Sequence, residues 1–130
     1  AYESTETGRN EIYVRPFPDV NSGKWQVSTL GGINPVWANS GREIFYISGS
    51  TLVAAQVSLT EGLEVLARQS LFDMGDRGLF RGANYTGWDV SQDGETFIMI
   101  QFGAGDGGDR PNEFILVQNW GEEAKARLSR

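Results

Sequence analysis

The sequence predicts an all-β chain, and three observations point to it. Short runs rich in β-branched and aromatic residues recur along its 130 residues, with Gly, Pro, Asn, Asp and Ser gathered between them. Two similar strand–turn–strand motifs follow one another, as in a chain built from repeats. Helical character is confined to one short segment near the C-terminus.

Ten strands are expected from these runs. Tight polar turns ending at Gly41 and Gly94 join neighbouring strands, because glycine supplies the positive φ that such turns need. Pro16 is expected only at a strand end or an edge, since it has no N–H to donate. The expected strands are, in order, Tyr2–Ser4, Glu11–Phe17, Lys24–Thr29, Ile33–Trp37, Glu43–Ser48, Leu52–Leu59, Ala67–Phe72, Tyr85–Val90, Thr96–Phe102 and Glu113–Trp120.

A short helix is expected over Gly121–Leu128. Glu122 and Glu123 precede Lys125 and Arg127 there, which is the order that the helix dipole favours. Because the segment is short, its helical structure depends on docking against the rest of the chain.

The internal repeat extends beyond the two turns. Asn10–Val14 matches Asn112–Leu116, and Thr51–Val57 occupies the same place after the first turn motif. The two turn motifs are spaced more widely than the roughly 40–45 residues of a usual propeller blade. An insertion at Asp73–Asn84, where three Gly stand among mixed charges, explains the extra length.

The two turn motifs carry a family resemblance. Pro35–Gly41 (PVWANSG) and Trp88–Gly94 (WDVSQDG) resemble the Pro-x-Trp-Ser-Pro-Asp-Gly turn of TolB-like, WD-like β-propellers, although Ala38, Asn39 and Ser40 replace Ser-Pro-Asp in the first copy. The chain is similar to the C-terminal blades of bacterial kinase-associated or transport-type propellers. The resemblance implies a partial β-propeller of about two and a half four-stranded blades with a short C-terminal helix.

One domain over residues 1–130 is expected, with blade portions at about 1–30, 31–72 and 85–120 and a helical tail at 121–130. Such a set of blades cannot close a ring alone, and its unpaired edges invite other chains. The chain is therefore either part of a larger ring or a unit that closes by symmetric association. We favour a homo-oligomer, with a protein or peptide as a further kind of partner.

Charge and composition exclude several partners. The formal net charge of −6 repels phosphate backbones, so nucleic acid is not an expected partner. No apolar run approaches the roughly 20 residues of a membrane helix, so membrane insertion is not expected, and the start has no signal-peptide pattern. The chain is expected to be soluble, but the absence of Cys leaves its compartment open.

The chemistry available points away from catalysis. The chain has no His and no Cys, which removes the common general base and every Ser-His or Cys-His dyad. No Gly-x-Ser-x-Gly elbow or P-loop is present. We therefore predict a non-catalytic binding or scaffold module that self-associates and contacts protein partners.

A metal site is conceivable only in the glycine-rich segment 103–113. Asp106 and Asp109, together with backbone carbonyls, are candidate Ca²⁺ ligands there. The alternative is an elongated hairpin loop without a ligand. No other cofactor is expected.

Aromatic residues offer a candidate ligand site beside the insertion. Phe80, Tyr85, Trp88 and Asp89 are the candidate residues for a face that binds a sugar or a peptide. Packing between blades is the alternative role for the four tryptophans, and capping of the turn that ends at Gly94 is the alternative for Asp89. The tryptophans are Trp25, Trp37, Trp88 and Trp120.

Two alternative functions stay open. A carbohydrate-binding or glycosidase-like propeller would use paired carboxylates, although solvated surface is the competing role for acids near strand ends. The candidate acids are Glu11, Glu43, Asp89, Glu95 and Glu113. The other alternative is a ligand-sensing segment of a longer, kinase-linked protein.

Overall fold

The computed structural model describes residues 1–82, 85–101 and 114–117, and in these residues the chain contains strands and connections without a helix. The prediction of an all-β chain is confirmed. The expected helix over Gly121–Leu128 lies outside the described residues. The strands are β1 (Tyr2–Ser4), β2 (Glu11–Val14), β3 (Trp25–Gln26), β4 (Ile33–Trp37), β5 (Glu43–Ser48), β6 (Thr51–Ser58), β7 (Glu64–Asp73), β8 (Trp88–Val90), β9 (Phe97–Ile100) and β10 (Phe114–Val117).

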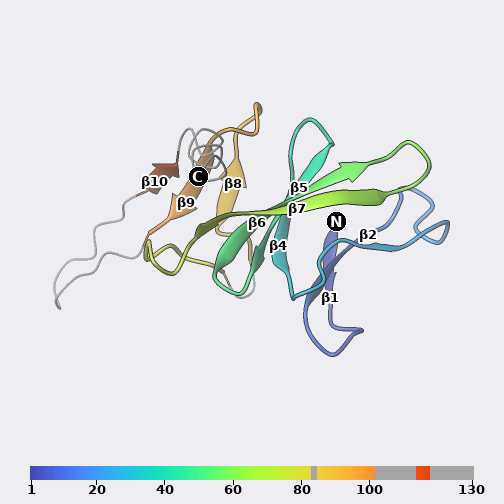
Figure 1. The fold of residues 1–130 in the computed structure, drawn as a ribbon, viewed down its shortest axis with the longest axis horizontal. Helices are drawn as coiled ribbons and strands as arrows, with labels where there is room; N and C mark the ends of the chain where they lie inside the picture. The colour runs from blue at the N-terminus through green and yellow to red at the C-terminus, as the bar shows by residue number, and fades with distance from the viewer. Residues whose placement is uncertain (83–84, 102–113, 118–130) are drawn as a thin grey trace, which may run out of the picture.

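The strands form three separate antiparallel sheets, each a meander of consecutive strands (Figure 1). The first sheet has the order β1-β2-β3, the second β4-β5-β6-β7 and the third β8-β9-β10. Within each sheet, strands that follow one another in the chain are also neighbours in the sheet, and every pair is antiparallel. The second sheet lies between the other two in Figure 1, and none of the three closes into a barrel.

Both faces of the second sheet are buried, which explains the unbroken apolar run of β5. Ile44 and Tyr46 face a core shared with Ile12 of the first sheet, whereas Phe45 and Ile47 face a core shared with Phe97 of the third. Side chains alternate across a strand, so both sets can be apolar only when each face is covered. The second sheet is therefore the centre of the molecule.

Several strand boundaries differ from the expected ones. β2 ends at Val14 instead of Phe17, because Pro16 and Pro18 follow and cannot extend the hydrogen-bond ladder. β7 begins at Glu64, three residues before the expected Ala67, since it pairs with β6 from Ser58 onwards. Tertiary pairing thus set the start of β7, whereas local sequence set the end of β2.

The two predicted glycine turns are confirmed. Gly41 and Gly94 have φ of 66° and 78°, and each N–H donates to the carbonyl three residues earlier at 2.9 Å. The suggestion that Asp89 caps the second turn is not supported, because among the described residues the Asp89 carboxylate accepts from the adjacent Val90 N–H and from no N–H of the turn. Ser91 and Asp93 stabilise that turn instead, through the N–H groups of residues 96 and 95.

One buried residue of β4, Asn34, hydrogen-bonds both to β1 and to the connection that precedes β8. Asn34, in a bulge of β4 with φ of 53°, is 5% exposed. Its N–H donates to Glu3 Oε1 of β1 at 2.7 Å, and its Nδ2 donates to the carbonyl of Arg81 at 2.6 Å. Asn tolerates a left-handed backbone better than other non-glycine residues, so it can serve this junction.

The tryptophans pack between sheets, as the packing alternative expected. Trp25 and Trp37 cover the core between the first and second sheets, and Trp88 lies in the core between the second and third. Trp120 lies outside the described residues.

Candidate functional site

Two of the predicted aromatic residues lie together at the surface. The rings of Phe80 and Tyr85 have centroids 5.4 Å apart at an interplanar angle of 39°, and Tyr85 is 61% exposed. Phe80 packs directly over Gly87, where an added Cβ would come within 2.7 Å of its ring. The absence of a side chain at Gly87 is what lets this ring lie against the third sheet.

Trp88 points the other way and does not join that pair. It is 5% exposed, with its ring centroid 6.0 Å from that of Phe97. Gly87 comes directly before Trp88, the first residue of β8, and consecutive residues of an extended chain point to opposite sides of the sheet. Sequence proximity suggested one aromatic face, but the alternation of a strand divides it.

The surface pair belongs to a larger apolar area. In β9, Phe97 and Met99 face the core, while Ile98 is 45% exposed and Ile100 is half-buried on the opposite side. Ile100 also approaches Gly87, within 3.8 Å of a Cβ built there. We call this area, made of Phe80, Tyr85, Gly87, Ile98 and Ile100, the outer face of the third sheet.

One acidic residue borders this outer face. Asp89 is exposed and pairs with Ile98 across β8 and β9. Of the four predicted ligand-binding residues, Phe80 and Tyr85 thus lie on the outer face, Asp89 lies beside it, and Trp88 lies in the core.

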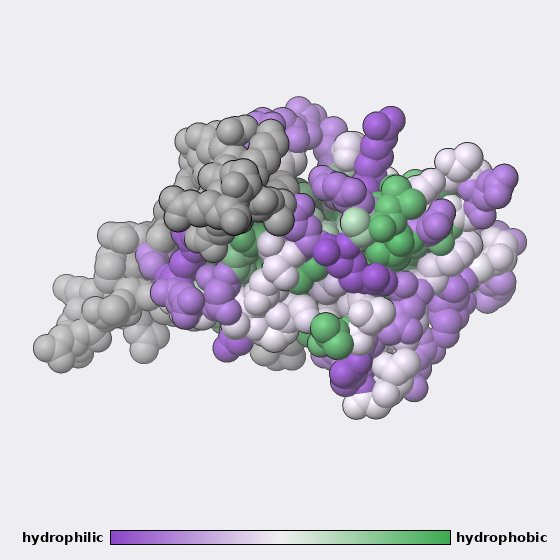
Figure 2. Space-filling view, viewed as in Figure 1, coloured by the Kyte–Doolittle hydropathy of each residue, from purple (hydrophilic) through white to green (hydrophobic). Residues whose placement is uncertain are grey.

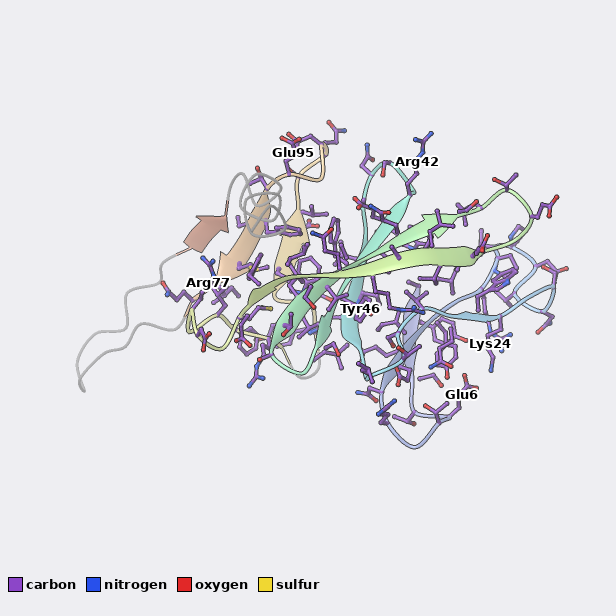
Figure 3. All side chains as sticks on the ribbon, viewed as in Figure 1. Glu6, Lys24, Arg42, Tyr46, Arg77 and Glu95 are labelled. Carbon is purple, nitrogen blue, oxygen red and sulfur yellow. The ribbon has the colours of Figure 1, made fainter. Side chains whose placement is uncertain are left out.

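The predicted Ca²⁺ ligands and most of the candidate catalytic acids do not form a site among the described residues. Asp106, Asp109 and Glu113 lie outside the described residues. Within the described residues, no three acidic side chains gather closely enough to hold a metal ion. Glu43 and Glu95 lie at separate strand ends, half-buried and exposed respectively, and Figure 3 shows Glu95 on the turn before β9.

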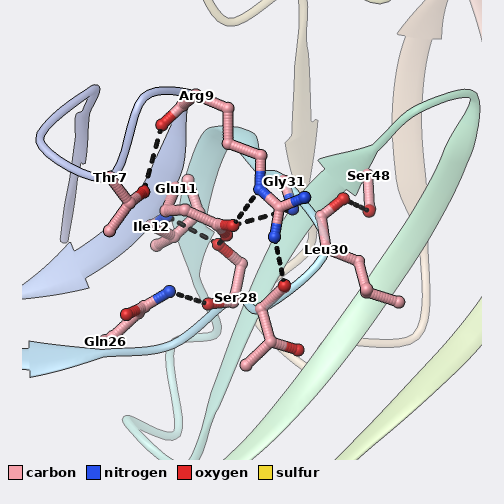
Figure 4. Close-up of polar contacts among 10 residues, drawn as sticks. Thr7, Arg9, Glu11, Ile12, Gln26, Ser28, Leu30, Gly31 and Ser48 are labelled. Atoms are coloured by element: carbon pink, nitrogen blue, oxygen red, sulfur yellow. Dashed lines mark hydrogen bonds and ion pairs between the residues drawn. The ribbon is translucent and has the colours of Figure 1, made fainter.

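Glu11 differs from the other candidate acids because it is almost completely buried, at 1% exposure (Figure 4). Its Oε1 accepts from Arg9 Nε at 2.7 Å and from the Gly31 N–H at 3.0 Å. Its Oε2 accepts from the Ser28 hydroxyl, whose oxygen in turn accepts from the Ile12 N–H at 2.7 Å. All three contacts act within the protein, so the group is placed to fix the loop after β3.

The electrostatics of Glu11 agree with this structural role. Burial alone would raise the pKa of the Glu11 carboxyl, but hydrogen bonds from Ser28, Arg9 and Gly31 outweigh it and hold that pKa below its ordinary value. Glu11 is therefore a charged and fully partnered carboxylate at neutral pH. Its position at the start of a strand gave no sign of this burial, since Ser28 and Gly31 lie about twenty positions further along the chain.

A hollow of about 380 Å³ lies at one end of the interface between the first and second sheets. The sequence gave no indication of it, because its lining comes from four separate segments. Its lining residues are Thr29, Leu30, Tyr46, Ser48, Thr51, Val53, Arg68 and Ser70. Tyr46 is buried at its base, and burial raises the pKa of the Tyr46 hydroxyl although Arg68 opposes the shift.

The face of the molecule in Figure 2 is mostly hydrophilic, with apolar residues in a few separate areas. In the described part of the chain, no helix is long and apolar enough to span a bilayer.

Comparison of the chain with protein-family models, with curated proteins and with solved structures found no match.

Proposed function

We propose that the chain is a non-catalytic binding module made of propeller-type blades, and that it self-associates through the outer face of the third sheet. The observation that carries the proposal is the stack of three meander sheets with three, four and three strands. Each sheet is taken as one blade or part of one blade, as the resemblance to TolB-like propellers implies. The third sheet is covered by protein on one face, and its outer face holds exposed apolar side chains.

The contacts inside the molecule support a sheet-on-sheet association. Phe97 of the third sheet meets Phe45 of the second edge to face, with ring centroids 5.0 Å apart. The outer face of the third sheet offers side chains of the same kind, namely Ile98, Ile100 and the Phe80–Tyr85 pair. A second copy of the chain, presenting the same outer face, would bury these residues in an isologous dimer.

The opposite end of the stack is less suited to such a contact. On the outer side of the first sheet, Tyr13 is buried beneath Lys24, whose Nζ lies 5.2 Å from its ring centroid. Lys24 also pairs with Glu6 at 2.7 Å, and Figure 3 shows the two side chains close together. A charged cover of this kind opposes apolar stacking, which is why the proposal assigns the contact to the third sheet.

Edge pairing of the second sheet is also disfavoured. Its edge strand β4 carries Pro35 and the Asn34 bulge, and its other edge strand β7 pairs with β6 through two register shifts. Both features interrupt the regular row of N–H and C=O groups that a new strand needs. Association through a face is therefore preferred to the edge-to-edge association that the sequence led us to expect.

The experiment is light scattering across a dilution series, with Ile98→Lys as the test variant. Lysine at this position lies opposite Asp89, so the new charge has a partner on the neighbouring strand and the hairpin keeps its stability. Leu59→Lys is the matched control, because Leu59 is 57% exposed in the turn after β6, away from the third sheet.

We expect a wild-type dimer that persists on dilution, a monomeric Ile98→Lys protein and a dimeric Leu59→Lys protein. A monomeric wild type refutes self-association. A dimer that Ile98→Lys leaves intact refutes the assignment to the outer face. Circular dichroism of each variant distinguishes loss of association from loss of fold.

The alternative functions remain predictions. A carbohydrate-binding role is favoured by one observation, the exposed ring of Tyr85 beside Phe80, which offers a stacking surface. Thermal-shift measurements with neutral sugars, compared between wild type and Tyr85→Ala, test it. The glycosidase-like role and the kinase-linked sensor stay predictions, as does Ca²⁺ binding at Asp106 and Asp109, which lie outside the described residues.

A further inference from the structure

The hollow between the first and second sheets exists because β3 is short. β3 ends at Gln26, after two residues, whereas β7 runs for ten residues on the opposing sheet. Arg68 and Ser70 of β7 line the hollow, and the described residues that line it from the connection after β3 are Thr29 and Leu30. Ser48 fixes the position of this connection, because its hydroxyl donates to the carbonyl of Leu30 at 3.3 Å (Figure 4).

The floor of the hollow is an ordered array across three strands. Pairing places Tyr46, Val53 and Ser70 in one row over β5, β6 and β7. Ser48 and Thr51 form the next row toward the hairpin end, and Arg68 follows in the row on the other side. All of these residues share one sheet face, so their functional groups converge on one space.

Arg68 alone is charged among the described residues that line the hollow. Its Nε donates to the carbonyl of Val27 at 2.7 Å, which fixes the guanidinium against the first sheet while the residue stays exposed. The ion pairs of the described residues are Arg9–Glu11 and Lys24–Glu6, so Arg68 has no carboxylate partner there. Glu11, whose charge acts on Tyr46, is already bound by Ser28, Arg9 and Gly31.

Apart from Arg68, the polar side chains that line the hollow carry hydroxyl groups. In the described part of the chain, the side chains of Thr51 and Ser70 make no hydrogen bond within the protein, so they are available to a ligand as both donors and acceptors. The apolar surface of Leu30, which is 81% exposed, and of Val53 completes the lining. The volume is suited to a ligand of about one sugar ring.

We propose that this hollow binds a small polyhydroxylated carboxylate, with Arg68 holding the carboxylate and Ser70 and Thr51 holding hydroxyl groups. A planar guanidinium matches a carboxylate through two parallel N–H···O bonds, and it has donors left after the Nε bond to Val27. The described residues that line the hollow include no acid, and the nearby Glu11 carboxylate, whose charge acts on Tyr46, is already bound by Arg9, Ser28 and Gly31, so an anion meets less repulsion there than beside an unpaired acid. This site is separate from the outer face of the third sheet, so it does not depend on self-association.

Three probes separate the parts of this recognition. Glucuronate carries a carboxylate and hydroxyls, glucose carries the hydroxyls alone, and propionate carries the carboxylate alone. Each is titrated into the 130-residue protein, and binding is followed by the backbone amide resonances of Thr51 and Ser70. We expect glucuronate to shift these resonances and to bind at least about tenfold more tightly than either simpler probe.

Variants then test the assigned residues. Arg68→Gln is expected to weaken glucuronate binding at least about tenfold, and Ser70→Ala roughly threefold. Arg42→Gln is the matched control, because Arg42 is exposed before the first residue of β5, at the opposite end of that strand from Ser48 (Figure 3). Should Arg68→Gln fail to fold, Arg68→Lys keeps a positive charge and is expected to retain weakened binding.

Three outcomes would overturn the proposal. Wild-type protein that does not respond to glucuronate refutes the site. Equal affinity for glucose and glucuronate refutes the role of the carboxylate. A folded Arg68→Gln protein that binds as tightly as the Arg42→Gln control refutes the role of Arg68.

Discussion

Replacing Glu11 by Gln should destabilise the protein by about 2–3 kcal/mol, although the two side chains have the same shape. The change removes the negative charge from a carboxylate that is 1% exposed and accepts from Arg9, Gly31 and Ser28. A glutamine can keep its oxygen toward Arg9 and Gly31, but its NH₂ group then faces Ser28. The Ser28 hydroxyl, which donates to the Glu11 carboxylate in the wild-type protein, therefore loses its acceptor in the variant.

The ion pair with Arg9 supplies only a small part of this cost. Arg9 is 58% exposed, so solvent screens its attraction to Glu11 and the pair is worth at most about 1 kcal/mol. Arg9→Gln should therefore destabilise the protein less than Glu11→Gln does. A double-mutant cycle over these two residues measures the coupling directly.

The assay is urea-induced unfolding at pH 7, followed by tryptophan fluorescence. A loss of 2–3 kcal/mol lowers the midpoint by roughly 1–2 M at an unchanged slope. Glu43→Gln is the control, since Glu43 also begins a strand but makes no side-chain hydrogen bond among the described residues, and it should stay within about 0.5 kcal/mol of wild type. Glu11→Gln protein with wild-type stability would refute the reasoning.

The same carboxyl makes stability depend on pH. Its pKa in the folded protein lies below the ordinary value of 4.5, so its contribution is complete above about pH 4.5 and is lost as the pH falls through the lower, folded-state pKa. The stability difference between wild type and Glu11→Gln should therefore shrink in acid. A difference that stays constant down to pH 2 would contradict the lowered pKa.

Further predictions concern the core and the turns. Phe97→Ala should cost about 3–5 kcal/mol in urea unfolding, because this buried ring contacts aromatic rings of both the second and third sheets. Gly94→Ala should cost about 1–2 kcal/mol from backbone strain alone, since φ is 78° and an added Cβ would touch nothing; a smaller loss would mean that the turn relaxes. Trp88→Phe should cost only about 1 kcal/mol, because the lost packing is offset by removal of a buried Nε1–H that has no hydrogen-bond partner among the described residues. A loss of stability near that of Phe97→Ala would indicate that the Nε1–H does have a hydrogen-bond partner.

The strands and turns of this protein followed closely from local sequence. Glycine at positions 41 and 94 indicated turns because only glycine takes positive φ without strain. The run Ile44–Ile47 indicated a strand because its residues suit a pleated surface, and its lack of polar alternation is satisfied by burial on both faces. These are properties of a few neighbouring residues, and a sequence displays them directly.

The candidate sites depended on contacts that the sequence does not display. Phe80 and Tyr85 met as expected, yet Trp88 faces the opposite side of its strand, and the register that decides this is fixed by pairing with β9. Glu11 looked like any acid beside a strand until residues from the next loop enclosed it.

Local sequence by itself determined that the chain is all-β, where its glycine turns fall and which residues are apolar enough for a core, because these depend on the conformational preferences of short segments. Tertiary structure alone decided which face each side chain occupies, that Glu11 is buried and charged, and that Arg68 meets Ser70 and Thr51 in one hollow. The physical reason is that burial and convergence arise between segments far apart in the chain, where the length of one strand, such as the short β3, leaves space over another.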